Sequence, residues 1–187
     1  MEVTPDDLDV VTYPDPVLRR KAKPVGEVND EVRAVAQRMI ELMYDHEGIG
    51  LAGPQVGLGW RIFVAHVPPG EERALTDDPP TCTEGPGVYI NPEISEPAGE
   101  LEPYEEGCLS LPEIRGQVFR PPAVTITATG LDGVRFTRRG AGLLARCWQH
   151  ELDHLNGVLI IDRMTQMSRL KNRSAVRALE REGDEFR

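Results

Sequence analysis

Apolar residues in the first quarter of the chain repeat with a helical period. Between positions 32 and 43 they recur every three or four residues, which predicts a helix with one buried face. Asn29 precedes this stretch as a helix N-cap, and two acidic residues follow it in the first turn. We expect this helix to end near His46. Two later helices are expected at about 141–156, where Gly157 is the C-terminal stop, and at 165–181.

Other segments follow the two-residue period of a strand. Residues 61–67 and 88–94 are strand-like, and residues 124–129 alternate apolar side chains with threonine. A turn at 131–133 leads from that segment into 134–138, which predicts a hairpin with one solvated face. Residues 68–87 are dense in proline, glycine and acidic side chains, so we expect an exposed loop. A glycine-rich loop is expected at 48–57.

The expected elements combine into one architecture. There is neither an internal repeat nor a linker long enough to divide the chain. We therefore expect residues 1–187 to form a single α+β domain. Its mostly antiparallel sheet should pack around the central helix at 141–156, with an N-terminal and a C-terminal helix outside.

Composition narrows the classes of function. The chain has 187 residues with 40% hydrophobic and 28% charged residues, which is ordinary for a soluble protein. No apolar run approaches the roughly 20 residues of a membrane helix, and the acidic start predicts no signal peptide, so we expect a cytoplasmic protein. A net charge of −10 disfavours DNA binding. Basic residues gather only between 165 and 182, where they indicate a solvated helix face or a docking surface.

The segment Gln149-His150-Glu151-Leu152-Asp153-His154 carries the strongest chemical signal. On a helix, His150 and His154 lie about 40° apart and one turn from each other, so both imidazoles can reach one metal ion. Glu151 falls about 60° from His154, beside the ion, where a general base for a water molecule would stand. The motif thus predicts a catalytic metal site.

A third ligand is expected from one of three cysteines. Cys147 lies seven residues before His154, roughly 10.5 Å along a straight helix, so we expect it to pack as a small apolar side chain. Cys82 lies in the acidic loop and is expected to be a surface thiol. Cys108 follows Gly107 in an extended segment where the backbone can approach a ligand, and it is the predicted third ligand. One cysteine and two histidines suit Fe²⁺, Zn²⁺, Ni²⁺ or Co²⁺.

Three segments in order resemble the peptide deformylases, whose patterns are G-x-G-x-A-A-x-Q, E-G-C-L-S and H-E-x-D-H. They stand here at Gly48–Gln55, Glu106–Ser110 and His150–His154, with Gly53 in place of the second alanine. The resemblance implies a metal-dependent hydrolase that removes the formyl group from the N-terminal formyl-methionine of nascent peptides. It implies that Cys108, His150 and His154 bind the metal, Fe²⁺ being the usual ion, and that Glu151 is the acid/base. It also implies an oxyanion hole formed by Gln55 and the Leu109 backbone N–H.

Further residues are expected around the substrate. Gly50 should lie at the catalytic group and, with Gly107, let the peptide backbone run alongside as an added strand. Apolar walls for the methionine side chain are expected from Ile49, Tyr104, Leu143 and Cys147. Arg146 either narrows the pocket rim or reaches into solvent. Asp153 and Arg120 are expected to pair and brace the helix. Some relatives use the basic C-terminal region to dock on the ribosome, which suggests the same partner here.

Two other readings stay open from the sequence. The H-E-x-x-H motif also occurs in zinc metallopeptidases, although their third ligand generally lies downstream of the second histidine and this chain has no later histidine. A non-catalytic protein with a structural metal would need a fourth ligand, from Cys82 or Cys147, because such sites are normally closed by four side chains.

Overall fold

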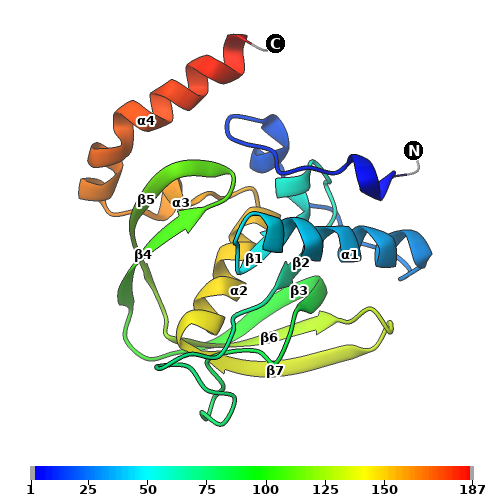
Figure 1. Cartoon of the computed structure of the whole chain (residues 1–187). Coiled ribbons are helices and arrows are strands. Elements are labelled where there is room, and N and C mark those ends of the chain that lie inside the picture. Colours follow the sequence, from blue (N-terminus) through cyan, green and yellow to red (C-terminus); the bar gives the residue numbers. More distant parts are fainter. Residues whose placement is uncertain (1–2, 186–187) are drawn as a thin grey trace.

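The computed structural model describes residues 3–185, which form two antiparallel sheets with helices between and around them (Figure 1). The larger sheet has the strand order β1-β2-β3-β6-β7. Its strands are β1 (Gly50–Ala52), β2 (Ile62–Ala65), β3 (Gly87–Ala98), β6 (Ala123–Thr129) and β7 (Arg135–Ala141). The second sheet is the hairpin of β4 (Glu102–Cys108) and β5 (Leu111–Arg120).

The helices connect and flank these sheets. They are α1 (Asp30–Asp45), α2 (Gly142–Leu155), α3 (Ile160–Arg163) and α4 (Gln166–Glu185), with short 3-10 turns at Pro5–Asp7, Pro16–Arg19 and Gly53–Val56. The Asn29 side chain accepts a hydrogen bond from the Val32 N–H at 3.0 Å, so α1 starts at the predicted cap. No helix among the described residues is long and apolar enough to cross a membrane. The α+β class and the three long helices are confirmed.

The larger sheet is buried on both faces at its β1–β2 end, and β2 shows why. Phe63 and Ala65 pack in the cluster that contains α2, whereas the alternate residues Ile62 and Val64 pack in the cluster that contains α1. A strand buried on both faces reads as a continuous apolar run. Figure 1 shows α2 running through the middle of the molecule, between this sheet and the β4–β5 hairpin. The helix is therefore held on several sides by other elements.

Three strands, β1, β4 and β5, were not predicted. The glycine-rich loop contains the short strand β1, and the segment expected only to be extended at 105–112 is part of the β4–β5 hairpin. In β5 the inward positions are Ile114, Gly116, Val118 and Arg120, and β4 buries Glu106. Buried charges and a glycine at these positions hide the apolar alternation that would have predicted a hairpin.

The loop between β2 and β3 differs from the expectation at one point. It has only the isolated bridge between Gly70 and Arg73 as regular structure, as a loop should. Cys82, however, is 2% exposed, so the prediction of a surface thiol is wrong. The loop is tied to the body of the protein because the Ala141 N–H donates to the Pro80 carbonyl at 2.9 Å and the Thr83 N–H to the Val67 carbonyl at 2.8 Å. These bonds turn Cys82 inward.

Candidate metal centre

Helix α2 and the end of β4 bring three possible metal ligands together. His150 Nε2 and His154 Nε2 lie 3.2 Å apart, as expected for residues one turn apart on a helix. Cys108 Sγ lies 3.2 Å from His154 Nε2. Cys108 is placed by a bulge in the β4–β5 ladder between Gly107 and Cys108. All three ligand atoms lie within 4.8 Å of one another, which is the convergence that one ion requires.

The rest of the site fits a catalytic rather than a structural ion. Within residues 3–185 the convergent group has three members, and Cys147 is not one of them. Its thiol instead donates to the Ile49 carbonyl at 3.4 Å, and burial raises its pKa well above the usual value. One thiolate and two imidazoles beside a cavity suit a divalent transition-metal ion with an open position. The reading as a closed four-ligand site therefore has no support in the described residues.

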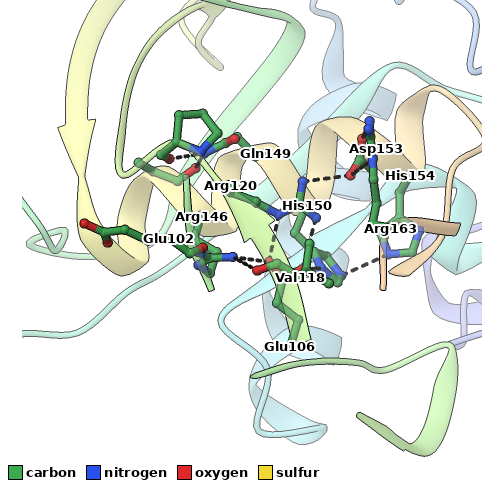
Figure 2. Close-up of polar contacts among 12 residues, drawn as sticks. Glu102, Glu106, Val118, Arg120, Arg146, Gln149, His150, Asp153, His154 and Arg163 are labelled. Carbon is green, nitrogen blue, oxygen red and sulfur yellow. Dashed lines mark hydrogen bonds and ion pairs between the residues drawn. The ribbon is translucent and has the colours of Figure 1, made fainter. Parts of the chain in front are cut away.

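Glu106 orients His150 from behind the metal site (Figure 2). One of its carboxylate oxygens lies 3.1 Å from His150 Nδ1, which leaves Nε2 facing the other ligands. The same carboxylate accepts two bonds from Arg120, at 2.7 and 3.0 Å, and one from Arg146 at 2.8 Å. Burial raises the pKa of Glu106, but the bonds from His150 and Arg120 outweigh burial and hold it well below its usual range. Glu106 therefore stays ionised.

Two arginines connect this carboxylate to the rest of the fold. Arg120 also donates to Asp153 at 2.8 Å, so the predicted pairing of these two residues is confirmed, and Arg163 donates to Asp153 at 2.7 Å. Arg146 is 8% exposed and donates to the carbonyls of Val118 and Glu102. The alternative in which Arg146 reaches into solvent is therefore wrong. Sequence reasoning gave no role to Glu106, although its place two residues before Cys108 was a usable signal.

Glu151 lies next to the candidate ligands and is buried from solvent. It is 3% exposed, and its Oε2 has no hydrogen-bond partner in the described part of the chain. Burial raises the pKa of Glu151 to about 7. A carboxyl group with such a pKa can both accept and donate a proton near neutral pH. Gly50 makes room for it, since a Cβ at Gly50 would lie 2.3 Å from Glu151 Oε1.

Gln55 is held in one orientation by the backbone. The Ala52 N–H donates to Gln55 Oε1 at 2.8 Å, and because that N–H can only donate, the amide nitrogen must point the other way. Gln55 Nε2 lies 3.6 Å from Cys108 Sγ and 3.4 Å from Ser110 Oγ. A donor at the edge of the cavity is thus fixed before any substrate arrives.

A cavity of about 580 Å³ opens over this group. Of the residues predicted for the site, all but His154 line it; His154 is 1% exposed. The lining members of the predicted set are Ile49, Gly50, Gln55, Tyr104, Gly107, Cys108, Leu109, Leu143, Arg146, Cys147, His150 and Glu151. Three segments distant in sequence therefore meet at one concave surface. Their individual roles toward a substrate stay predictions.

Comparison with known proteins agrees with this arrangement. The family model of polypeptide deformylase matches residues 7–170. The chain is 44% identical over 161 residues to a peptide deformylase of Agrobacterium fabrum, covering 86% of this chain and 88% of the relative. It is 43% identical over 175 residues to a peptide deformylase of Acidobacterium capsulatum, covering 94% and 96%. The region matched by the family model includes Cys108, His150, Glu151 and His154.

Solved structures show the same likeness in three dimensions. A plant peptide deformylase superposes with a TM-score of 0.85 at 39% identity, covering 96% of this chain and 92% of that one. The peptide deformylase of Plasmodium falciparum superposes with a TM-score of 0.84 at 36% identity, covering 95% and 98%. Sequence, fold and the geometry of the ligands lead to one conclusion. This chain belongs to the polypeptide deformylase family.

Proposed function

We propose that the chain hydrolyses the formyl amide at the N-terminal formyl-methionine of newly made peptides, releasing formate and a free amine. The observation that carries this proposal is the convergence of Cys108, His150 and His154 beside the buried carboxyl group of Glu151. The chain's membership of the deformylase family supports the same reaction. We also propose that residues 1–187 act as a single catalytic domain.

Cys108, His150 and His154 would hold the metal ion. When bound, a divalent ion supplies a Lewis acid that lowers the pKa of a water molecule and polarises a carbonyl oxygen. The buried Glu106 carboxylate keeps His150 in the tautomer that presents Nε2 to this ion. A neutral imidazole held in this way does not have to reorganise when it binds.

Glu151 would move the proton. Its carboxylate takes a proton from water, and the resulting oxygen nucleophile attacks the formyl carbon. Glu151 then gives the proton to the leaving nitrogen as the C–N bond breaks, so that formate and the peptide amine are released. The cavity-facing side of Glu151 is adjacent to Gly50, where no side chain stands between it and the substrate.

Gln55 and Leu109 would stabilise the negative oxygen that develops on the formyl group. The Gln55 amide nitrogen is already directed toward Cys108, so it donates without reorganising. Removing one such donor typically costs on the order of 10²–10³ in rate. Gly50 and Gly107 line the cavity, and the peptide backbone would lie along them. The methionine side chain would lie among other residues of the same lining: Ile49, Tyr104, Leu143, Arg146 and Cys147.

The first experiment compares the hydrolysis of formyl-Met-Ala-Ser with that of its acetyl counterpart, on protein purified without oxygen. Glu151→Gln should keep one metal ion per chain and lose formyl release, since only the proton carrier is removed. Glu41→Gln makes the same exchange on α1 and serves as the matched control. Absence of formyl release from wild-type protein that carries metal would refute the proposal, and cleavage of unblocked peptides would favour the metallopeptidase instead.

The physiological ion is proposed to be Fe²⁺. The thiolate and two imidazoles suit Fe²⁺ as well as Zn²⁺, Ni²⁺ and Co²⁺, and the resemblance to the family favours iron. Metal analysis of protein purified without oxygen tests this, with activity measured after each ion is added to metal-free protein. Iron should give the highest rate, and air should abolish that rate over time because the thiolate and ferrous iron are both oxidisable.

The ribosome is proposed as a partner in the cytoplasm, through exposed basic residues of α4. Arg169, Lys171 and Arg173 are solvent-exposed on this helix, and Met167 is 74% exposed beside them. The experiment is pelleting with ribosomes at increasing salt. Exchange of the three basic residues for glutamine should weaken pelleting at low salt. Pelleting that neither salt nor this exchange reduces would count against the proposal.

A further inference from the structure

A second cavity, of about 590 Å³, lies under the loop between β2 and β3 and away from the metal centre. Its walls come from that loop, from β3 and β7, and from α2. Figure 1 shows the loop passing below the start of α2, where the Ala141 N–H holds the Pro80 carbonyl. The lining side chains are mainly apolar or aromatic: Leu75, Pro80, Cys82, Pro86, Tyr89, Leu144 and Trp148. The reaction described above uses none of them.

Two buried donors in this cavity lack acceptors. The Tyr89 hydroxyl and the Trp148 indole N–H each belong to a side chain that is 1% exposed, and neither has a hydrogen-bond partner within the described residues. The Trp148 N–H approaches the Tyr89 oxygen closely enough to oppose the effect of burial on its pKa. Even a bond between them would leave the Tyr89 hydroxyl proton without an acceptor. Buried polar groups in proteins are nearly always paired, so this one is directed at something else.

The same corner carries a positive charge. The Arg138 guanidinium lies 5.0 Å above the Phe136 ring, and it has no hydrogen bond or ion pair with any residue between 3 and 185. Arg138 and Tyr89 both line the cavity. Burial raises the pKa of Tyr89 to about 12, and the charge of Arg138 lowers it only in part. Tyr89 is therefore a donor at every physiological pH. Arg139, the next residue, is already bonded to Thr125 and Glu96.

Gly87 packs closely against the Tyr89 ring and hydroxyl and places no side chain over them. A Cβ at Gly87 would lie 3.0 Å from the Tyr89 hydroxyl oxygen, tighter than an ordinary contact. The one carboxylate on the lining, Glu84, is exposed, so water screens its repulsion of an anion. An occupant would thus meet apolar walls, two neutral donors and one guanidinium. That set matches an acceptor-bearing anion attached to an apolar body.

We propose that this cavity binds a small organic acid with an apolar body, whose carboxylate accepts hydrogen bonds from Tyr89 and Trp148 beside Arg138. The site is distinct from the metal centre and does not depend on the reaction. Leu144 and Trp148 form its wall on α2, whereas Leu143, Cys147 and Glu151 on another face of the same helix line the catalytic cavity. One helix therefore separates two binding sites.

The test is a fluorescence titration of the metal-loaded protein with 4-phenylbutyrate in a Trp60→Phe background, where Trp148 is the remaining indole. We expect a saturable change in Trp148 emission at millimolar or lower concentration, and weaker binding of the matched alcohol, 4-phenylbutanol. Arg138→Gln and Tyr89→Phe should each weaken binding about tenfold, as the loss of a charged or buried hydrogen bond would. Gly87→Ala should block the site.

Arg135→Gln is the matched control, because Arg135 lies on the same strand but does not line the cavity, and its affinity should change less than twofold. Formyl release by each variant reports that the protein is folded. Absence of saturation up to roughly 10 mM, as expected if water alone fills the cavity, would overturn the proposal. Binding that survives Arg138→Gln and Gly87→Ala unchanged would do so as well, since the acid would then occupy the metal centre.

Discussion

The space at Gly50 leads to a quantitative prediction about the position of Glu151. A Cβ built there lies 2.3 Å from Glu151 Oε1, 2.8 Å from its Cδ and 2.9 Å from Cys147 Sγ, whereas ordinary contacts begin at 3.4 Å. In Gly50→Ala the carboxylate must therefore retreat by about 1 Å. The backbone cannot yield in its place, because Gly50 is buried and paired with Ala65 in the sheet.

A displacement of about 1 Å in a catalytic group typically costs on the order of 10²-fold in rate. We expect Gly50→Ala to lower kcat for formyl-Met-Ala-Ser by about this factor. Metal content should be unchanged, because the three ligands are not displaced. The assay is steady-state deformylation, with metal analysis of the same preparation. Gly59→Ala is the control, since a Cβ at Gly59 meets no atom within 4 Å.

The reasoning would be refuted if Gly50→Ala kept more than a third of the wild-type kcat. It would also be refuted if activity fell only because metal was lost, since the ligands would then be the displaced groups. A rise in KM with unchanged kcat would mean that the methyl group blocks the peptide backbone and leaves Glu151 in place. The split between kcat and KM therefore locates the clash.

Three further results are expected. Arg146→Met removes a buried partner of Glu106 and of two backbone carbonyls, so the free energy of unfolding measured in urea should fall by about 3 kcal/mol. A fall below about 1 kcal/mol would mean that Arg120 holds Glu106 without help from Arg146. Between pH 10 and 12 the unfolded state releases the Tyr89 proton while the folded state keeps it, so the free energy of unfolding should fall with rising pH by up to about 3 kcal/mol. In Tyr89→Phe the fall should be smaller by this amount, and an equal fall in both proteins would contradict the prediction. Removal of the metal by a chelator should lower the free energy of unfolding by roughly 2.7 kcal/mol when the ion was present at 100 times its dissociation constant. The same treatment of Cys108→Ser should cause a smaller loss, and equal losses would mean that Cys108 is not a ligand.

The sequence predicted the long elements because each has a strong local signal. The apolar period and the cap at Asn29 located α1, and the H-E-x-x-H spacing located both the centre of α2 and two of the candidate metal ligands. Cys108 was found because a glycine precedes it in an extended segment. The Asp153–Arg120 pair followed only from the family pattern and has since been found in the fold.

What the sequence did not predict depends on contacts between distant segments. Glu106 and Arg146 are 40 residues apart, and nothing local shows that they share a buried hydrogen bond. Cys82 lies in a segment whose composition is typical of an exposed loop, and only the bond from Ala141 to Pro80 reveals that the segment folds back. The unpaired hydroxyl of Tyr89 is likewise a property of the packed fold.

The buried carboxylate of Glu106 has a consequence for the alignment of the β4–β5 hairpin. Side chains alternate between the two faces of a strand, so a shift of β4 by one residue would turn Glu106 to the outer face and leave Arg120 and Arg146 without their carboxylate. Arg120 would keep only its bond to Asp153, and Arg146 would be a buried cation without an ionic partner, which is far more costly than a misplaced apolar residue. Cys108 lies two residues further along the same strand, so the register that satisfies these charges also delivers the thiol to the histidines. These charge pairs therefore favour the correct register of the hairpin whether or not a metal ion is bound.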